Sequence, residues 1–94
     1  MAVVHINATV GTAVTKLFTL PTGLARNVAV QIQNQDTAAI FIGDSTITTS
    51  GAGRGHSIAN GASFQIWLNS GDSVYGISAA GTAAGAVVIT YSGI

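Results

Sequence analysis

Two histidines and three aspartates are the residues of this chain with the best potential for acid–base or metal chemistry. His5 falls on the polar side of an alternating run, without a second histidine or a carboxylate at a matching spacing, so no metal site is indicated there. His56 lies beside Arg54 in a glycine-rich stretch, where the plain interpretation is a solvated loop histidine and the sharper one a contact to a partner. We therefore expect no catalytic residue, no metal, no cofactor and no enzymatic activity.

Two glycine-containing motifs suggest active sites but are better explained as turns and loops. The run Gly51-Ala52-Gly53-Arg54-Gly55 lacks the Gly-Lys-Ser/Thr ending and the helix of a phosphate-binding loop. The tripeptide Gly-Asp-Ser occurs at 43–45 and 71–73, yet each copy follows an expected strand and no Gly-x-Ser-x-Gly elbow surrounds it. Neither motif predicts a catalytic site.

The charge content of the chain is very low. Only 6% of the 94 residues are charged and the formal net charge is zero, whereas soluble proteins average about 25% charged residues. Nucleic-acid binding is not expected, because it needs a basic surface for the phosphates. Low net charge also gives little protection against association. Because the chain is small and has no cysteine, we expect oligomerisation to reinforce it.

No segment predicts a membrane or secretory role. No apolar run reaches the roughly 18 residues of a transmembrane helix, and the first residues lack the basic and apolar regions of a secretory signal. We expect a protein that is made in the cytoplasm and has no membrane partner.

Apolar and polar residues alternate with period two along most of the chain, and no window has the helical period. The expected strands cover 3–10, 13–20, 27–33, 38–43, 63–68, 73–78 and 86–91. Seven or eight short strands separated by turn residues predict a single all-β domain over 1–94, an antiparallel β-sandwich or small barrel that is jelly-roll-like. Residues 1–23 could form an N-terminal arm or edge strands.

Residues 28–43 are expected to form a β-hairpin around which the domain is organised. A three-residue loop from Asn34 to Asp36 gives one wholly apolar face. The expected pairs are Ile32 with Ala38, Val30 with Ile40 and Val28 with Ile42. The other face of the hairpin is our first candidate for a partner surface. Its residues are Ala29, Gln31, Gln33, Ala39 and Phe41.

Trp67 is the only tryptophan, on the side of its expected strand opposite Phe64, Ile66 and Leu68. Either this strand is buried on both sides, or Trp67 is an interface anchor, since tryptophan is enriched at binding hot spots.

The stretch from Ser50 to Asn60 is expected to be a long exposed loop. Its glycines make ordering costly, about 1 to 2 kcal/mol per residue, so we expect it to be mobile until a partner orders it. Arg54 is the residue best suited to a bidentate contact with that partner, followed by His56.

The stretch from Val28 to Tyr91 resembles small β-rich virion proteins of tailed bacteriophages. The segments that carry the resemblance are 30–34 (VQIQN), 40–50 (IFIGDSTITTS), 58–64 (IANGASF) and 71–78 (GDSVYGIS). It implies a structural protein of the virion, commonly a trimer, such as a capsid decoration (cement) protein or a head-fibre or tail-associated module. The segment from Met1 to Gly23 is not part of the match.

We expect a decoration protein that binds and stabilises the capsid lattice. Its expected partners are further copies of itself, as a homotrimer, and the major capsid protein or another virion protein. The candidate partner-binding residues are Arg54, His56, Trp67, Phe41, Gln31 and Gln33. The alternative is a carbohydrate- or receptor-binding module of a fibre or tail, in which Trp67 and Tyr75 stack on a sugar ring.

Overall fold

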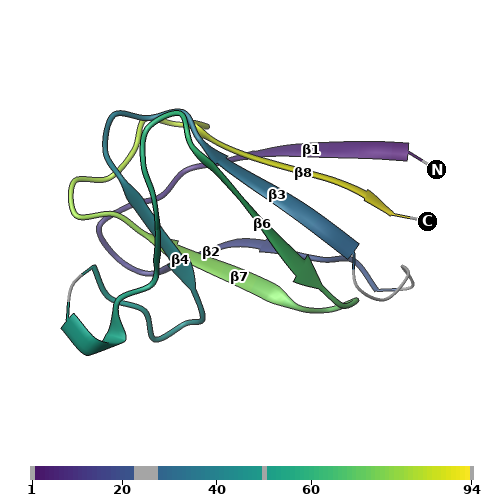
Figure 1. Cartoon of the computed structure of the whole chain (residues 1–94), viewed down its shortest axis with the longest axis horizontal. Helices are drawn as coiled ribbons and strands as arrows, with labels where there is room; N and C mark the ends of the chain where they lie inside the picture. The colour runs from purple at the N-terminus through teal and green to yellow at the C-terminus, as the bar shows by residue number, and fades with distance from the viewer. Residues whose placement is uncertain (1, 23–27, 50, 94) are drawn as a thin grey trace.

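Eight short strands make up the fold in the computed structural model, which describes residues 2–22, 28–49 and 51–93 (Figure 1). The strands are β1 (Ala2–Ala8), β2 (Thr15–Thr19), β3 (Val28–Asn34), β4 (Ile40–Gly43), β5 (His56–Ile58), β6 (Ser63–Leu68), β7 (Ser73–Ile77) and β8 (Val87–Gly93). Among the described residues, the only helical element is a 3-10 turn, Gly51–Gly53. No helix in these ranges is long and apolar enough to cross a membrane.

The strands form two four-stranded antiparallel sheets packed as a sandwich. The first sheet has the order β1-β8-β3-β6 and the second has the order β2-β7-β4-β5. This order, in which the chain passes repeatedly from one sheet to the other, is that of a jelly roll. The predicted all-β, jelly-roll-like sandwich is therefore confirmed, and β1 and β2 each lie at the edge of a sheet.

The predicted hairpin between β3 and β4 is wrong, because these two strands lie in different sheets. β3 pairs with β6 and β8, so that Val30 faces Ile66 on one side and Tyr91 on the other. β4 pairs with β5 and β7 instead. The apolar sides of both strands were correctly predicted, but they meet across the sandwich and not across a hairpin. Alternation identifies the buried side of a strand and leaves its neighbour undetermined.

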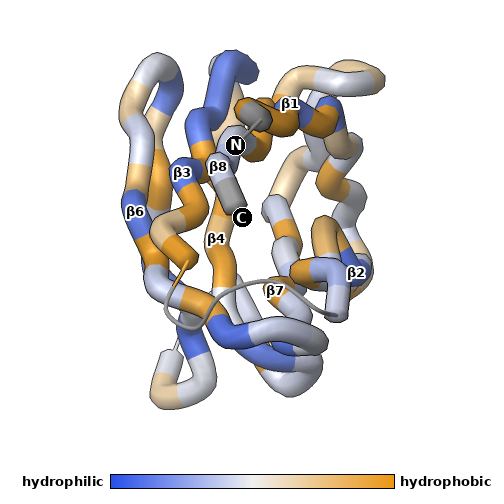
Figure 2. Tube along the Cα trace, turned by 90° about the vertical axis from the view of Figure 1, so that its right-hand side faces the viewer, coloured by the Kyte–Doolittle hydropathy of each residue, from blue (hydrophilic) through white to orange (hydrophobic). Residues whose placement is uncertain are grey.

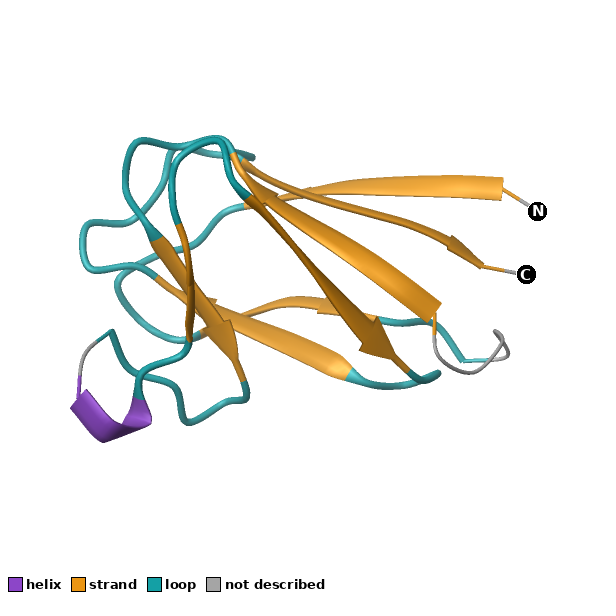
Figure 3. Ribbon diagram, viewed as in Figure 1, coloured by secondary structure: helices purple, strands orange, loops and turns teal. Residues whose placement is uncertain are grey.

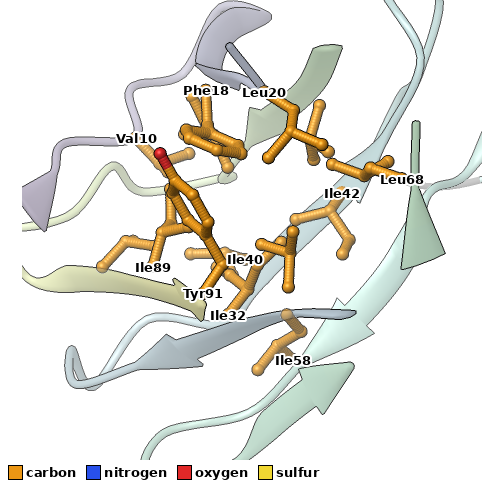
Figure 4. Packing of buried hydrophobic residues seen from close by; sticks show 14 of the residues in the cluster. Val10, Phe18, Leu20, Ile32, Ile40, Ile42, Ile58, Leu68, Ile89 and Tyr91 are labelled. Atoms are coloured by element: carbon orange, nitrogen blue, oxygen red, sulfur yellow. The ribbon is translucent and has the colours of Figure 1, made fainter. Parts of the chain in front are cut away.

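The core lies between the two sheets and consists of aliphatic and aromatic side chains, most of them valines and isoleucines (Figure 4). Ile32 and Ile89 of the first sheet and Ile40 of the second are fully buried. The rings of Phe18 and Tyr91 meet across the sandwich with their centroids 5.2 Å apart. Burial of this apolar surface, rather than any disulfide, holds the sheets together.

A bulge in β2 lets two consecutive residues face the core. The pairing register between β2 and β7 shifts between Lys16 and Phe18, and both Leu17 and Phe18 are buried. Leu17 lies over Gly76, where an added Cβ would come within 2.9 Å of the leucine side chain. Such a bulge bends the strand and re-aims its side chains.

The side chain of Asn34 ties together the loops at one end of the sandwich. Its Nδ2 donates hydrogen bonds to the carbonyl oxygens of Ala38 and Ile58, each at 2.9 Å, and its Oδ1 accepts one from the backbone N–H of Asp36. Asp36 Oδ2 in turn accepts a bond from the N–H of Ala83. We call the loops 35–39, 59–62 and 78–86 the Asn34 loop cluster, which lies at the upper left of Figure 3.

The expectation of one long loop over 50–60 is wrong in its second half, where β5 forms. Ile42 of β4 pairs with His56 and Ile40 with Ile58. The strand was missed because it has only three residues and follows a glycine-rich stretch. Gly55 lets the backbone of this segment come close to β4, since a Cβ at this position would lie 2.5 Å from the carbonyl oxygen of Ile42. The expected boundary residues Met1, Gly23, Asn27 and Ser50 lie outside the described residues.

Candidate functional site

The outward-facing side of the first sheet is the strongest candidate for a binding surface. Alternation along β3 buries Val30 and Ile32 and turns Gln31 outward, and along β6 it buries Leu68 and exposes Trp67. We call this surface the outer face. Its residues are Val3, His5 and Asn7 of β1, Val88, Thr90 and Ser92 of β8, Ala29, Gln31 and Gln33 of β3, and Ser63, Gln65 and Trp67 of β6. None of them is an aspartate, glutamate, lysine or arginine.

The strand register arranges the outer face in cross-strand rows. One row consists of His5, Thr90, Gln31 and Gln65. The next consists of Asn7, Val88, Gln33 and Ser63. A third row lies on the opposite side of the first one, and in it Val3 pairs with Ser92 and Ala29 pairs with Trp67. Neighbouring rows of amides and hydroxyls thus end beside one large aromatic side chain.

Trp67 stands out of this surface. Its side chain is 62% exposed, so the interpretation in which β6 is buried on both sides is excluded. Ala29, its cross-strand partner, is small and covers little of the indole. Tryptophan combines a large apolar area with an N–H donor, which suits it to an interface. Along β6, blue and orange segments alternate in Figure 2, as expected for a strand with one buried and one outward side.

Two glutamine amides of the outer face, those of Gln31 and Gln33, take part in side-chain hydrogen bonds. Gln31 Nε2 donates to Ser63 Oγ at 3.1 Å, across the β3–β6 pair. Gln35 Nε2 donates to Gln33 Oε1 at 3.0 Å. These bonds orient the amides along the sheet surface, where their remaining donors and acceptors are available to a partner.

The predicted partner surface of Ala29, Gln31, Gln33, Ala39 and Phe41 is not one face. Phe41 lies on the outward side of the second sheet, where it pairs with Ser57 and Ile77. Ala39 is in the connecting loop, and its carbonyl oxygen accepts a bond from Ser78 Oγ. The prediction fails because the chain crosses the sandwich between Gln33 and Phe41, which puts the two halves on opposite sides of the molecule.

Trp67 and Tyr75 cannot stack on one sugar ring within this domain. Trp67 faces outward from the first sheet, whereas Tyr75 faces outward from the second, between Lys16 and Gly43. The two sheets of a sandwich are about 10 Å apart, and the core lies between these two side chains. A carbohydrate site on this domain would have to use Trp67 without Tyr75.

Arg54 and His56 lie at the edge of the second sheet. Arg54 is exposed, forms an isolated parallel bridge with Thr48, and donates its backbone N–H to the carbonyl oxygen of Gly51 at 3.3 Å. The imidazole of His56 packs on the ring of Phe64, with centroids 4.0 Å apart. His56 therefore connects edge strands of the two sheets, a contact that was not predicted when His56 was assigned to a loop.

All three carboxylates of the chain hold turns. Backbone N–H groups of Ala83 and Ala38 bond Asp36 and lower the pKa of its carboxyl group. The hydroxyl and then the N–H of Thr46 do the same for the pKa of Asp44, with Thr46 Oγ1 2.6 Å from Oδ1. Asp72 Oδ2 accepts a bond from the N–H of Asn69 at 2.8 Å. Each carboxylate is thus committed to local structure.

Asn34 and Val3 have places in the structure that the sequence analysis did not assign to them: Asn34 was expected to begin a hairpin loop, and Val3 was given no role. Asn34 continues the buried side of β3 after Val28, Val30 and Ile32, so an amide at a core position was a readable signal. Val3 is 74% exposed on the outer face, and its place opposite the apolar run of Val4, Ile6 and Ala8 was readable as well.

Over the described ranges the surface has no pocket and no group of three or more potential metal ligands. No family model, no curated protein and no solved structure matches this chain.

Proposed function

We propose that this protein is a non-enzymatic structural protein of a phage virion, a capsid decoration (cement) protein that docks on the assembled lattice through the outer face. The observation that carries the proposal is an uncharged sheet surface on which Trp67 is 62% exposed beside rows of amides and hydroxyls. The centres of protein interfaces are depleted of charged residues and enriched in aromatic ones. In this proposal the chain is made in the host cytoplasm and acts on the virion.

The energetics of the outer face favour docking on protein. Covering the exposed part of a tryptophan side chain removes roughly 120 Å² from water, which stabilises a complex by about 3 kcal/mol. The surrounding side chains carry no formal charge, so a partner strips water from no ionised group when it docks. The partner would be the major capsid protein or another virion protein.

The jelly-roll order and the sequence resemblance add support. Jelly rolls recur in viral capsid proteins and in lectins, so the fold is compatible with both of the roles considered. Fold alone does not decide function. The resemblance of Val28 to Tyr91 to virion proteins favours the structural role over the lectin-like one.

A particle-binding assay with Trp67→Ala tests the proposal. Removing the indole should weaken binding to particles that lack this protein by about 100-fold. Lys16→Ala is the matched control, because Lys16 is exposed on the second sheet, and it should bind as the unchanged protein does. Normal binding by both Trp67→Ala and Gln65→Ala would overturn docking through the outer face. Loss of binding by Arg54→Ala alone would move the contact to the loop before β5.

A carbohydrate-binding role is the second candidate, favoured by the exposed indole next to the amides of Gln65 and Gln31. Aromatic rings with neighbouring hydrogen-bonding groups suit the faces and hydroxyls of sugars. Because Trp67 is the sole tryptophan, its fluorescence reports directly on that surface. Titration with soluble glycans should shift this fluorescence if the protein binds carbohydrate. It should leave the fluorescence unchanged if the protein docks only on protein.

A further inference from the structure

The sandwich has four edge strands, and those of the second sheet are protected against pairing with another chain. β2 carries Lys16 and a register shift between Lys16 and Phe18. β5 is only three residues long. Charged side chains, bulges and short length are the usual devices by which edge strands avoid intermolecular pairing.

The edge strands of the first sheet have none of these protections. β1 pairs with β8 over seven residues and β6 pairs with β3 over six, without a register shift. Neither strand contains a charged residue or a proline. Among the described residues, backbone hydrogen bonds of β1 and β6 go only to the neighbouring strand of the same sheet. Each strand thus presents a long, regular and uncharged edge.

The core is also incomplete at these two edges. Five hydrophobic residues are only partly buried against it, and all of them lie on β1 or β6. They are Val4, Ile6 and Ala8 of β1, and Phe64 and Ile66 of β6. Within the described ranges, the two large hydrophobic residues that are exposed, Val3 and Trp67, lie on the same two strands.

We infer that the first sheet continues from one copy of the chain to the next, with β6 of one copy paired to β1 of a second. Neighbouring strands of this sheet are antiparallel throughout. A second copy in the same orientation therefore presents its β1 antiparallel to β6 of the first. Its outward side chains remain on the outer face, and its inward ones remain over the core.

One register of this pairing sets the apolar residues of β1 opposite those of β6 and the polar residues opposite polar ones. Placing Val3 opposite Trp67 sets Val4 opposite Ile66 and Ile6 opposite Phe64, so that the partly buried hydrophobic residues of the two edges cover one another. The same register sets His5 opposite Gln65 and Asn7 opposite Ser63, which are polar pairs on the outer face. A slip by one residue would place apolar side chains opposite polar ones. A slip by two residues would keep the two sides but would place Val3 opposite Gln65 or Asn69 instead of Trp67.

This contact is heterologous, because different edges of the two copies meet. Heterologous contacts form closed rings when the rotation that relates each copy to the next returns to the first copy, and they form open chains when it does not. The inference goes beyond docking on the lattice and holds with or without it.

Lysine pairs on each edge test the inference by light scattering of the purified chain. Val3→Lys/His5→Lys charges β1 and Ser63→Lys/Gln65→Lys charges β6, at residues that are all exposed. The unchanged protein should have the mass of several copies, and each variant the mass of one. Gln31→Lys/Gln33→Lys is the matched control, because it adds the same charge to the same face on a central strand, and it should remain assembled. A monomeric unchanged protein would overturn the inference.

Mixing the two edge variants separates this pairing from a two-fold one. Each variant keeps one intact edge, β6 in the first and β1 in the second, so the mixture should form a 1:1 dimer and grow no further. A mixture that stays monomeric contradicts the pairing of β6 with β1. If the β6 variant alone remains a dimer, two β1 edges meet instead, and the inference is wrong.

A cysteine pair gives a second measurement that does not depend on added charge. Val3 and Trp67 lie on opposite edges of a four-stranded sheet, about 14 Å apart at the usual strand spacing, which is too far for a disulfide within one copy. The chain has no other cysteine. Val3→Cys/Trp67→Cys should therefore give a ladder of linked copies on oxidation, and Val3→Cys/Ala29→Cys should not. No ladder with the first pair would contradict the proposed register.

Discussion

The Asn34 loop cluster and the outer face use the same chemical groups for opposite purposes. In the loop cluster the amide of Asn34 is fully buried and forms hydrogen bonds with backbone groups of Ala38, Ile58 and Asp36. On the outer face Gln31 and Gln65 are exposed, and the amide of Gln31 donates to another exposed side chain, at Ser63 Oγ. A buried amide fixes the path of the chain because its partners have no water to replace it. An exposed amide adds little to stability and remains available to a partner.

Among the polar residues of the loop cluster and the outer face, Asn34→Ala should have the largest effect on stability. It removes hydrogen bonds to three backbone groups, and each buried group left without a partner costs about 1 to 3 kcal/mol. We expect the free energy of unfolding in urea to fall by about 3 kcal/mol or more. Gln31→Ala on the outer face is the control and should change it by less than about 0.5 kcal/mol. Equal effects of the two substitutions would show that burial does not determine how much an amide contributes to stability.

Ser78→Ala should have an intermediate effect, because it removes one bond of the cluster instead of three. Ser78 is fully buried and its Oγ donates to the carbonyl oxygen of Ala39 at 3.0 Å. The variant should lose about 1 kcal/mol of unfolding free energy in the same urea titration. A loss as large as that of Asn34→Ala would show that stability does not follow the number of bonds removed.

Acid should weaken the loop cluster through Asp36. Backbone bonds lower the pKa of its carboxyl group below the ordinary 3.8, so at a pH between the two values the unfolded chain binds more protons than the folded one. Stability is then fully present above 3.8 and is lost as the pH falls through the lowered pKa. Urea midpoints measured across this range should fall less steeply in Asp36→Asn. The slope that remains should come from Asp44, whose pKa is also lowered.

Trp67→Ala should have the smallest effect on stability. Its side chain is mostly exposed, so the unfolding free energy should change by less than about 0.5 kcal/mol, in contrast to its expected effect on particle binding. Leu68→Ala, one residue further along β6, removes a buried side chain and should cost about 2 to 5 kcal/mol. A large loss from Trp67→Ala would mean that the indole supports the fold and is not held ready for a partner.

The faces of the strands could be predicted from the sequence, and their neighbours could not. Alternation placed Val30 in the core and Gln31 outside, and it placed Trp67 opposite Leu68, because side-chain direction is a local property of a strand. Pairing depends on where the loops carry the chain. The bonds of Asn34 to residues as distant as Ile58 direct the chain from one sheet to the other, and no local pattern indicates them.

The candidate site was predicted only in part, because its residues depend on which strands are neighbours as well as on which side of a strand each residue lies. Gln31, Gln33 and Trp67 do share a surface, since β3 and β6 are neighbours. Phe41 was grouped with them through a hairpin that does not form. His56 was assigned to a loop because glycines surround it, whereas its packing on Phe64 depends on two edge strands meeting at the side of the sandwich.

The interleaved strand order also governs how this chain can fold. Of the eight strands in the described part of the chain, only β4 and β5 are neighbours both along the chain and within a sheet. β1 pairs with β8, so that Ala2 lies opposite Gly93 (Figure 1). Nearly every strand must therefore find its partner across a long stretch of chain, and sandwiches dominated by such distant pairings fold in roughly milliseconds to seconds. During synthesis on the ribosome, β1 has to stay unpaired until β8 has emerged.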